Sequence, residues 1–232
     1  MLELKHPYPV IARARGHSYG GDQGWAGSRT MRLWGCGVTS VTDLLWYLAE
    51  TRRCCAGRVF TPSSGALTMR RYRESVEEIR RRVPLFPGFG TNGVFLTWAL
   101  NHSLRRTGIP LRGRWCVSGK KLWSRMEEML SRDLPVILSV GPNFPRFWKG
   151  GKLTFYVRTA DGQYRPGPAI SAHYVNVTGM DEEWLRVSSW GRMFYVNRNE
   201  YEDYVRRCSC PLMSNLIDLR QIGPWERGKE SP

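Results

Sequence analysis

Long apolar segments are missing from this sequence. No uninterrupted apolar run approaches the roughly 18 residues that a membrane-spanning helix needs. The first residues, MLELKHPYPVIARARG, also lack the apolar core of a secretory signal. We therefore expect a cytoplasmic protein with no membrane partner. Apolar residues still make up 41% of the 232 residues, which is enough for a sizeable buried core.

Acidic residues are scarce relative to basic ones. The chain has 20 Asp and Glu against 35 Lys and Arg, a formal net charge of +15, which is compatible with binding to a polyanion. The basic residues are nevertheless spread along the whole chain, and no nucleic-acid-reading motif accompanies them. Local clusters include Arg52–Arg53, Arg70–Arg73 and Arg80–Arg82. We therefore expect a solvated basic surface and no specific nucleic-acid partner.

Cysteine pairs with the spacing of a zinc site are also absent. Such pairs are typically separated by about two to four residues, whereas Cys54 and Cys55 are adjacent and Cys208 and Cys210 are one residue apart. We interpret Cys54, Cys55, Cys116, Cys208 and Cys210 as core or incidental thiols and expect no metal.

One segment has the glycine spacing of a dinucleotide-binding motif but lacks the expected context. Residues 88–93 read G-x-G-x-x-G, but they follow a proline-rich turn rather than a strand. The acidic residue expected about 20 positions later is missing. We interpret this segment as a loop and helix cap, and we expect no cofactor.

Apolar residues recur with a helical period in the first half of the chain. Residues 1–33 show no clear period and predict an extended or looped lead-in. Apolar residues at steps of three and four then predict a helix that begins near Cys36. The buried face of this helix consists of Val38, Val41, Leu44, Leu45 and Leu48. The highly charged segment 68–83 predicts a second, solvent-facing helix.

Two more helices follow, with Asn92 and Ser118 as N-caps. Gly108 and Pro110 end the first of them. We expect its inward side to consist of Val94, Phe95, Trp98 and Leu104. The inward stripe of the second consists of Leu122, Met126, Met129 and Leu130.

After Leu134 the apolar period changes to two, which predicts short strands. The predicted strands cover residues 136–140, 153–158, 172–178, 185–188, 193–196 and 214–219, with a short helix from Asn199 to Tyr204. Helices followed by an antiparallel sheet make an α+β fold, with a cleft where the two halves meet. We expect one domain over residues 1–232, with a helical lobe over about 34–133 and a sheet lobe over about 134–220.

Cys36 stands where a thiol can act as a nucleophile. A thiol reacts as its thiolate, and an ordinary cysteine with a pKa of about 8.5 is mostly protonated at neutral pH. A helix N-terminus offers unpaired N–H groups and the positive end of the helix dipole, both of which favour the anion. Gly35 and Gly37 let backbone and substrate approach closely. The alternative is a small apolar residue packed at a helix start.

Two later segments supply candidate partners for this thiol. His173 shares a strand face with the apolar residues two and four positions later, so it points to the packed side and needs a partner. Ser188 lies at the end of the next predicted strand. We expect Ser188 to lie beside His173 and to accept a hydrogen bond that fixes the imidazole tautomer. Alternatively, Ser188 and Ser189 merely end a strand and Trp190 packs against it.

Together these segments resemble the papain-like cysteine peptidases. A Cys-Gly pair that opens an apolar helix, a His-Tyr-Val-x-Val-x-Gly strand and a Ser-Ser-Trp-Gly segment occur in this order. They are most similar to the bacterial branch related to bacteriocin-leader peptidases. The match extends over about residues 20–205, with close motif identity only around Cys36, His173 and Trp190.

The resemblance implies a papain-like fold with Cys36 as nucleophile, His173 as base and then acid, and Trp190 as a shield over the histidine contact. Ser188 falls where papain-like enzymes have Asn and leader peptidases have Asp, and a hydroxyl is a weaker orienter than either. Three explanations stay open. The site works without a strong third member, Ser189 substitutes, or catalysis is reduced or lost.

The oxyanion donor departs from the family pattern as well. That pattern places a Gln about half a dozen residues before the nucleophile, where this chain has Thr30 and Met31. Gln23 is the nearest Gln, and it either loops back to the site or lies on the surface. The backbone N–H of Cys36 supplies the other donor, beside Gly37.

The sequence thus predicts a cysteine peptidase or amidase that acts on a peptide or amide through an acyl-enzyme. Transfer of the acyl group to an amine would use the same intermediate. Two other classes stay open: a non-catalytic papain-like binding module, because of Ser188, and a basic nucleic-acid-binding protein, because of the charge. The sequence gives no indication of the oligomeric state.

Overall fold

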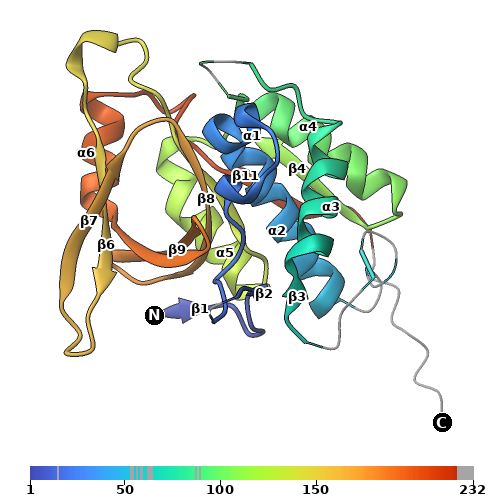
Figure 1. Ribbon diagram of the computed structural model, residues 1–232. Coiled ribbons are helices and arrows are strands. Elements are labelled where there is room, and N and C mark those ends of the chain that lie inside the picture. The colour runs from blue at the N-terminus through green and yellow to red at the C-terminus, as the bar shows by residue number, and fades with distance from the viewer. Residues whose placement is uncertain are drawn as a thin grey trace.

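Most helices lie on one side of the molecule and an antiparallel sheet on the other, with the last helix, Arg198–Arg207, on the sheet side (Figure 1). The computed structural model describes residues 1–14, 16–52, 55, 57, 60–61, 65–86, 88 and 90–223. Arg53, Cys54 and Phe89 lie outside the described residues. Within the described part, the expected α+β organisation is confirmed. No helix there is long and apolar enough to cross a membrane.

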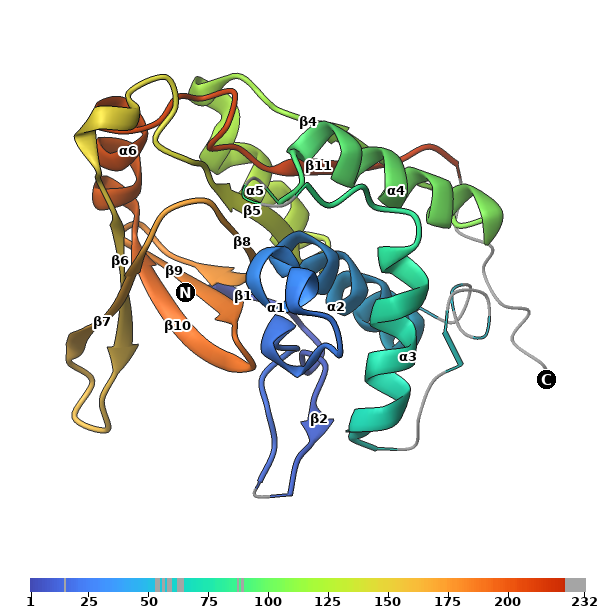
Figure 2. The same cartoon turned by 45° about the horizontal axis from the view of Figure 1, so that its top comes forward.

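The central element is α2 (Cys36–Thr51), which packs against β8 (His173–Met180) and against helices α3 and α4. Figure 2 shows α2 between the sheet and the other helices. The five apolar residues that predicted this helix are all completely buried. Because burial of one large apolar side chain contributes about 1.5–3 kcal/mol, this face anchors the helical half.

The described residues form five more helices, of which the last two pack mainly against strands rather than against α2. They are α1 (Arg29–Trp34), α3 (Met69–Arg80), α4 (Gly93–Arg106), α5 (Leu122–Ser131) and α6 (Arg198–Arg207), with the 3-10 turns η1 (Gln23–Trp25), η2 (Gly119–Lys121) and η3 (Phe147–Lys149). The lead-in prediction is therefore wrong for α1, which Ser28 caps by accepting from the Met31 N–H. A six-residue helix is too short to show a period in the sequence.

The predicted faces of α3 and α4 need correction. Helix α3 is not wholly solvent-facing, because Tyr72 and Ile79 are 1% exposed. In α4, Val94 and Trp98 are 60% and 52% exposed, opposite to the prediction. The buried face of α4 consists of Leu96, Ala99, Leu100 and Leu104. Positions 96, 100 and 104 are separated by four residues and share one face, whereas 94 and 98 lie on another.

The helix starts were predicted with mixed success. Thr68 and Asn92 cap α3 and α4 through their side chains. Ser118 precedes η2, and the N-cap of α5 is Lys121. The N-cap of α6 is Asn197 rather than Asn199, because the Asn197 side chain accepts from the N–H groups two and three residues later. The inward stripe of α5 is buried as predicted.

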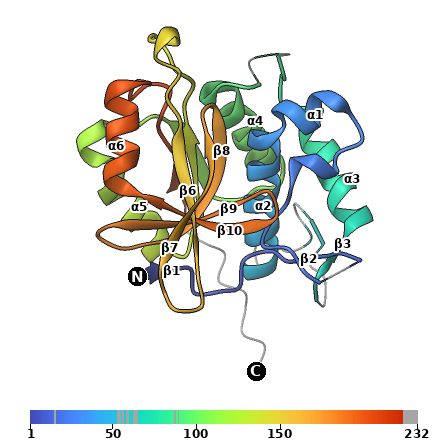
Figure 3. The same cartoon turned by 60° about the vertical axis from the view of Figure 1, so that its left-hand side comes forward.

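The main sheet is antiparallel throughout, with the strand order β1-β8-β9-β10-β6-β7 and β5 paired to β8. Figure 3 shows the sheet packed against α2. The bounds besides β8 are β1 (Leu2–Glu3), β5 (Val136–Val140), β6 (Leu153–Arg158), β7 (Tyr164–Ile170), β9 (Trp184–Ser189) and β10 (Arg192–Asn197). The prediction missed β7, in which Pro166 and Pro168 are tolerated because it is an edge strand.

Two small sheets lie outside the main one. The strand β4 (Leu111–Trp115) pairs antiparallel with β11 (Ile217–Gln221), so the predicted helical lobe also contains a strand. The strand β2 (Ile11–Ala12) pairs parallel with β3 (Leu67–Thr68). The first of these pairs returns the end of the described chain to the helical side of the molecule.

The corrected face of α4 gives a prediction for stability. Leu100→Ala should lower the free energy of unfolding by about 2–5 kcal/mol, because it leaves a cavity in the core. Trp98→Ser, two residues away on the exposed face, should change it by less than about 0.5 kcal/mol. Urea denaturation of both variants measures this, and a larger loss for Trp98→Ser would contradict the assigned face.

Candidate active site

A small cavity brings together every residue that the sequence analysis proposed for chemistry except Gly37. Its walls include Cys36, His173, Gln23, Ser188, Ser189 and Trp190. Its volume is about 10 Å³, which corresponds to about one water molecule. A substrate therefore cannot be engulfed here.

Cys36 is the first residue of α2 and is half-buried. The backbone N–H groups of Tyr174, Gly37 and Cys36 itself point at its sulfur and favour the thiolate. Burial outweighs them and raises the pKa of the thiol. The N–H groups at the helix start thus act on the thiol in the expected direction, but burial has the larger effect on its pKa. The physical reason is that little water reaches the sulfur.

Gly37 follows Cys36 at the point where α2 is closest to its neighbours. A Cβ at Gly37 would lie 3.1 Å from Leu96 and Thr91 and 3.2 Å from Tyr174. Its role in the described structure is therefore close packing between α2, α4 and β8. The sequence analysis had grouped Gly37 with substrate binding, but it does not line the cavity.

His173 is the first residue of β8 and is 7% exposed. It pairs with Val140 of β5, and the Ala172 before it has a positive φ of 55° where the chain turns into the strand. Burial lowers the pKa of His173 to about 3. At neutral pH the imidazole is thus uncharged, as a general base must be before it accepts a proton.

The hydrogen-bond partner of His173 is Ser189, not Ser188. The distance from His173 Nε2 to Ser189 Oγ is 2.7 Å. When the hydroxyl accepts from Nε2–H, Nδ1 is the unprotonated nitrogen and can accept a proton. Ser188 Oγ instead donates to the Tyr19 carbonyl at 2.8 Å.

The strand register explains why the prediction for Ser188 is wrong. Ser188 lies opposite Asn176, three residues beyond His173 along β8. Because side chains alternate along a strand, Ser188 and Ser189 face opposite sides, and only Ser189 shares the side of the imidazole. A one-residue error in register therefore exchanges the two serines.

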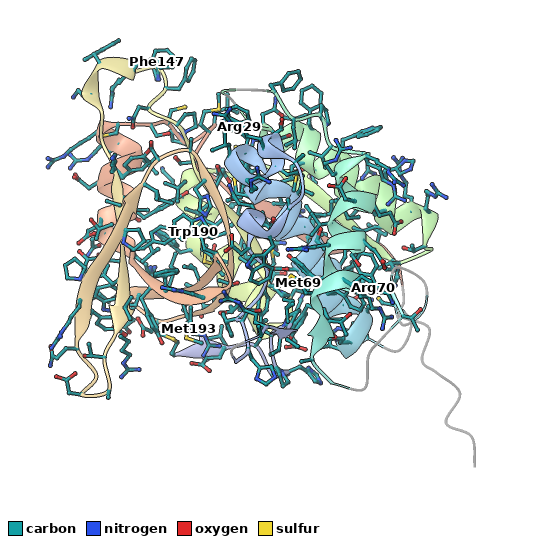
Figure 4. The ribbon with its side chains drawn as sticks, viewed as in Figure 1. Arg29, Met69, Arg70, Phe147, Trp190 and Met193 are labelled. Carbon is teal, nitrogen blue, oxygen red and sulfur yellow. The ribbon has the colours of Figure 1, made fainter. Side chains whose placement is uncertain are left out.

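Trp190 covers the imidazole as the resemblance implied. Its ring is stacked on His173 with 4.6 Å between centroids and 22° between planes. Phe155 packs against both rings. Trp190 has a positive φ of 49° at the turn between β9 and β10, and Figure 4 labels it where the sheet meets α2. This cover keeps water from the histidine and accounts for its lowered pKa.

Gln23 loops back to the cavity from η1. Its Nε2 donates to the Arg32 carbonyl in α1 at 2.9 Å, which ties the two short helices together. A carboxamide has two N–H groups, so one stays available to an acceptor in the cavity. Of the two alternatives for Gln23, the structure favours a position at the site.

Sequence analysis missed a buried carboxylate behind the thiol. Asp43 lies two helical turns after Cys36, is 2% exposed and also lines the cavity. It accepts from the Gly21 N–H at 2.9 Å and from the Tyr72 hydroxyl at 2.6 Å. Burial raises its pKa to about 7. The available signal was an acidic residue in the middle of an apolar helix face.

Asp43 fixes the segment that leads to Gln23. A Cβ at Gly20, whose φ is 70°, would lie 2.3 Å from Ser188 Oγ and 2.7 Å from Asp43 Oδ2, so only glycine fits. The Gly191 N–H donates to the Gly21 carbonyl at 2.8 Å. Residues 20 and 21 are thereby held between α2 and the turn that carries Trp190.

A second polar residue was missed beside Asp43. Asn176 on β8 is 1% exposed and donates from Nδ2 to the Ser40 carbonyl of α2 at 3.0 Å. This bond joins helix and strand directly below the cavity. Within the described part of the chain, no group of three or more His, Cys, Asp or Glu side chains is arranged to hold a metal ion.

The buried carboxylate gives a prediction for pH dependence. The folded pKa of Asp43 is about 7, above its unfolded value of 3.8, so its contribution to stability is complete below 3.8 and is lost as pH rises through 7. Asp43→Asn should remove this dependence. Between pH 5 and 8, the wild type should lose roughly 3 kcal/mol more stability than the variant.

Urea unfolding at both pH values tests this expectation. Glu182→Gln, in an exposed turn, serves as the control and should retain the wild-type dependence. Asn can still accept from the Gly21 N–H and donate to the Tyr72 oxygen, so the variant is expected to fold. Parallel pH curves for wild type and Asp43→Asn would mean that Asp43 does not titrate in this range.

No family model, curated protein or solved structure shows significant similarity to this chain. The relation to papain-like peptidases therefore stays a prediction based on three short motifs. The geometry of the site has to be judged on its own chemistry.

Proposed function

We propose that this chain is a cysteine peptidase or amidase of papain-like fold. One observation carries the proposal. Cys36, at the start of a buried helix, and His173, at the start of the adjacent strand, line the same cavity, and Ser189 holds the imidazole by Nε2. A nucleophile, a base and a residue that orients the base are thus present together.

The proposed reaction starts from neutral groups. The Cys36 sulfur attacks the acyl carbon of the substrate while its proton moves to Nδ1 of His173. The oxygen of the acyl group becomes an oxyanion, which accepts from the Cys36 N–H and the Gln23 carboxamide. The amine then leaves with the proton from the imidazolium, and a thioester forms on Cys36.

Water completes the cycle. His173 takes a proton from water, whose oxygen attacks the thioester carbon, and the thiol leaves with that proton as the acid is released. An amine in place of water would give acyl transfer by the same steps. Trp190 limits the water around the imidazole, so the water that reacts must enter from the side of the leaving group.

A non-catalytic binding module is the second candidate, because the pKa of Cys36 is raised and the orienting group is only a hydroxyl. Intact-mass spectrometry separates the two. Incubation of the protein with an activated ester should give an acyl adduct that maps to Cys36. The adduct should be absent in Cys36→Ser and strongly reduced in His173→Ala. Wild-type protein without any adduct would support the binding module.

The paired serines give a prediction for the acylation rate. Ser189→Ala should lower it about five- to tenfold, the effect of one neutral hydrogen bond of roughly 1 kcal/mol. Ser188→Ala removes an equally buried hydroxyl that does not touch His173, so it is the matched control. Rates of thioester formation measure both, and a larger loss in Ser188→Ala would argue against Ser189 as the orienter.

The lowered pKa of His173 gives a prediction for the pH profile. An exposed histidine, with a pKa of about 6.5, would be mostly protonated at pH 5 and the rate would fall about thirtyfold. Because the pKa of His173 is about 3, it stays a base, and the acylation rate should be nearly constant from pH 7.5 to 5. Stopped-flow acylation over this range tests it, and a decline centred near 6.5 would refute a desolvated base.

A further inference from the structure

The segment between β5 and β6 exposes aromatic side chains that the proposed chemistry does not use. Phe147 and Trp148 in η3 are 67% and 78% exposed, and Phe144 is 37% exposed. Phe144 and Phe147 pack edge to face with 5.5 Å between centroids. Figures 1 and 3 show η3 projecting beyond the rest of the sheet side, and Figure 4 labels Phe147 at this tip. We call residues 144–152 the aromatic tip.

The aromatic tip is also positively charged. It carries Arg146, Lys149 and Lys152, and the stretch from 134 to 160 contains no acidic residue. Within the described part of the chain, Lys149 and Lys152 form no ion pair. Arg146 donates to the Arg206 carbonyl at the end of α6, so its guanidinium connects the tip to that helix.

More cations and an exposed leucine surround the base of the tip. Pro145 and Arg146 share the walls of a cavity of about 620 Å³ with residues of η2, α6 and the segment after α6. Lys120 and Lys121 of η2 are exposed, and Arg207 lies beside Arg206. Leu212 in the last segment is 60% exposed. Asp203 on α6 forms ion pairs with Arg206 and Arg207, and Glu202 accepts from Trp123, so the positive charge around the tip rests mainly on the lysines of η2 and of the tip itself.

We infer that the aromatic tip docks this protein peripherally on a bilayer that contains anionic lipid, which departs from the expectation of no membrane partner and requires no membrane-spanning helix. Phe and Trp side chains partition into the interfacial region of a bilayer, and Lys and Arg beside them reach the headgroups. The excess of positive charge selects an anionic surface. A stacking platform for nucleic-acid bases is less well matched, because Phe147 packs its ring against Phe144 rather than lying on a strand surface.

The position of the tip relates docking to the candidate site. The tip leaves the sheet directly after Val140, the residue paired with His173. The Gly141 carbonyl at its base accepts from the Ala172 N–H, next to His173, at 3.2 Å. The segment that carries the tip thus starts beside the candidate site, and Figure 4 shows Phe147 at its outer end, away from Trp190. The inference itself is independent of the chemistry at Cys36, so Cys36→Ala should bind vesicles as the wild type does.

Sedimentation with sucrose-loaded vesicles tests the inference on the full chain. We expect binding to phosphatidylcholine vesicles that contain phosphatidylglycerol and much weaker binding to phosphatidylcholine alone. The double variant Phe147→Ser/Trp148→Ser should lose more than about tenfold in affinity, because two aromatic side chains no longer enter the bilayer. Lys149→Gln with Lys152→Gln should lose about fivefold per lysine.

Two controls make the outcome specific. Trp98→Ser removes an exposed tryptophan from α4, away from the tip, and should bind as the wild type does. Lipids brominated in the acyl chain should quench part of the fluorescence of wild-type protein but less of Trp148→Phe. Circular dichroism checks that the variants fold.

Three results would overturn the inference. They are wild-type affinity in the double tip variant, equal affinity for the two kinds of vesicle, and tip-dependent binding of a single-stranded oligonucleotide without binding of vesicles.

Discussion

The close packing of α2 against β8 is the constraint on which the candidate site depends. At Gly37 the space is tight, because a Cβ there would lie 3.2 Å from Tyr174 and its neighbours would have to shift by a few tenths of an ångström. Further along β8, the Asn176 side chain donates a hydrogen bond to the Ser40 carbonyl and so joins the strand to α2. This approach brings the N–H of Tyr174 to the Cys36 sulfur, and His173 is the neighbouring residue on the strand. A residue larger than glycine at 37 would press on Leu96, Thr91 and Tyr174 and so disturb the packing that positions Cys36 relative to β8.

The same packing removes water from the site and so determines its charge state. Burial shifts the pKa of the thiol and of Asp43 upward and that of His173 downward, each toward the neutral form. The N–H groups at the start of α2 act against this for Cys36 but do not outweigh it. Under the proposed function, the helix start would contribute mainly N–H donors to an oxyanion rather than ionisation of the resting thiol.

Sequence patterns predicted the parts of this fold in which local and tertiary preferences agree. The strands at 136–140 and 153–158 have the predicted bounds, and α2 has the predicted buried face. The predictions of the buried face of α4 and of the hydroxyl beside His173 were wrong. Each depends on the position of a neighbouring element, which the local sequence pattern does not contain. Aromatic residues such as Trp98 suggest a core, yet the burial of α4 follows from the position of β4 and α2.

Residues that join distant segments were the least predictable. Gln23 reaches the cavity because Arg32 and Asp43 hold α1 and the Gly20–Gly21 segment in place, and no periodic signal encodes such bonds. Asp43 itself had a weak signal, a charge on an apolar face. Strand β7 was missed because its prolines are unfavourable for a strand in the local sequence. They are tolerated in the structure because only one edge of this strand is paired.

The serine beside His173 is consistent with a site in which every member is buried without charge. A carboxylate at position 189 would lie under Trp190 in the same dry surroundings, and it would need either a cationic imidazole or a large desolvation cost. A hydroxyl avoids both, because it accepts the Nε2–H bond and carries no charge. The exclusion of water then accounts for three features together. They are the hydroxyl in place of a carboxylate beside His173, the lowered pKa of the imidazole and the raised pKa of the thiol. Under this condition the resting site carries no charge on either Cys36 or His173, and the proposed proton transfer between them has to be driven by the charge that develops on the acyl oxygen of a bound substrate.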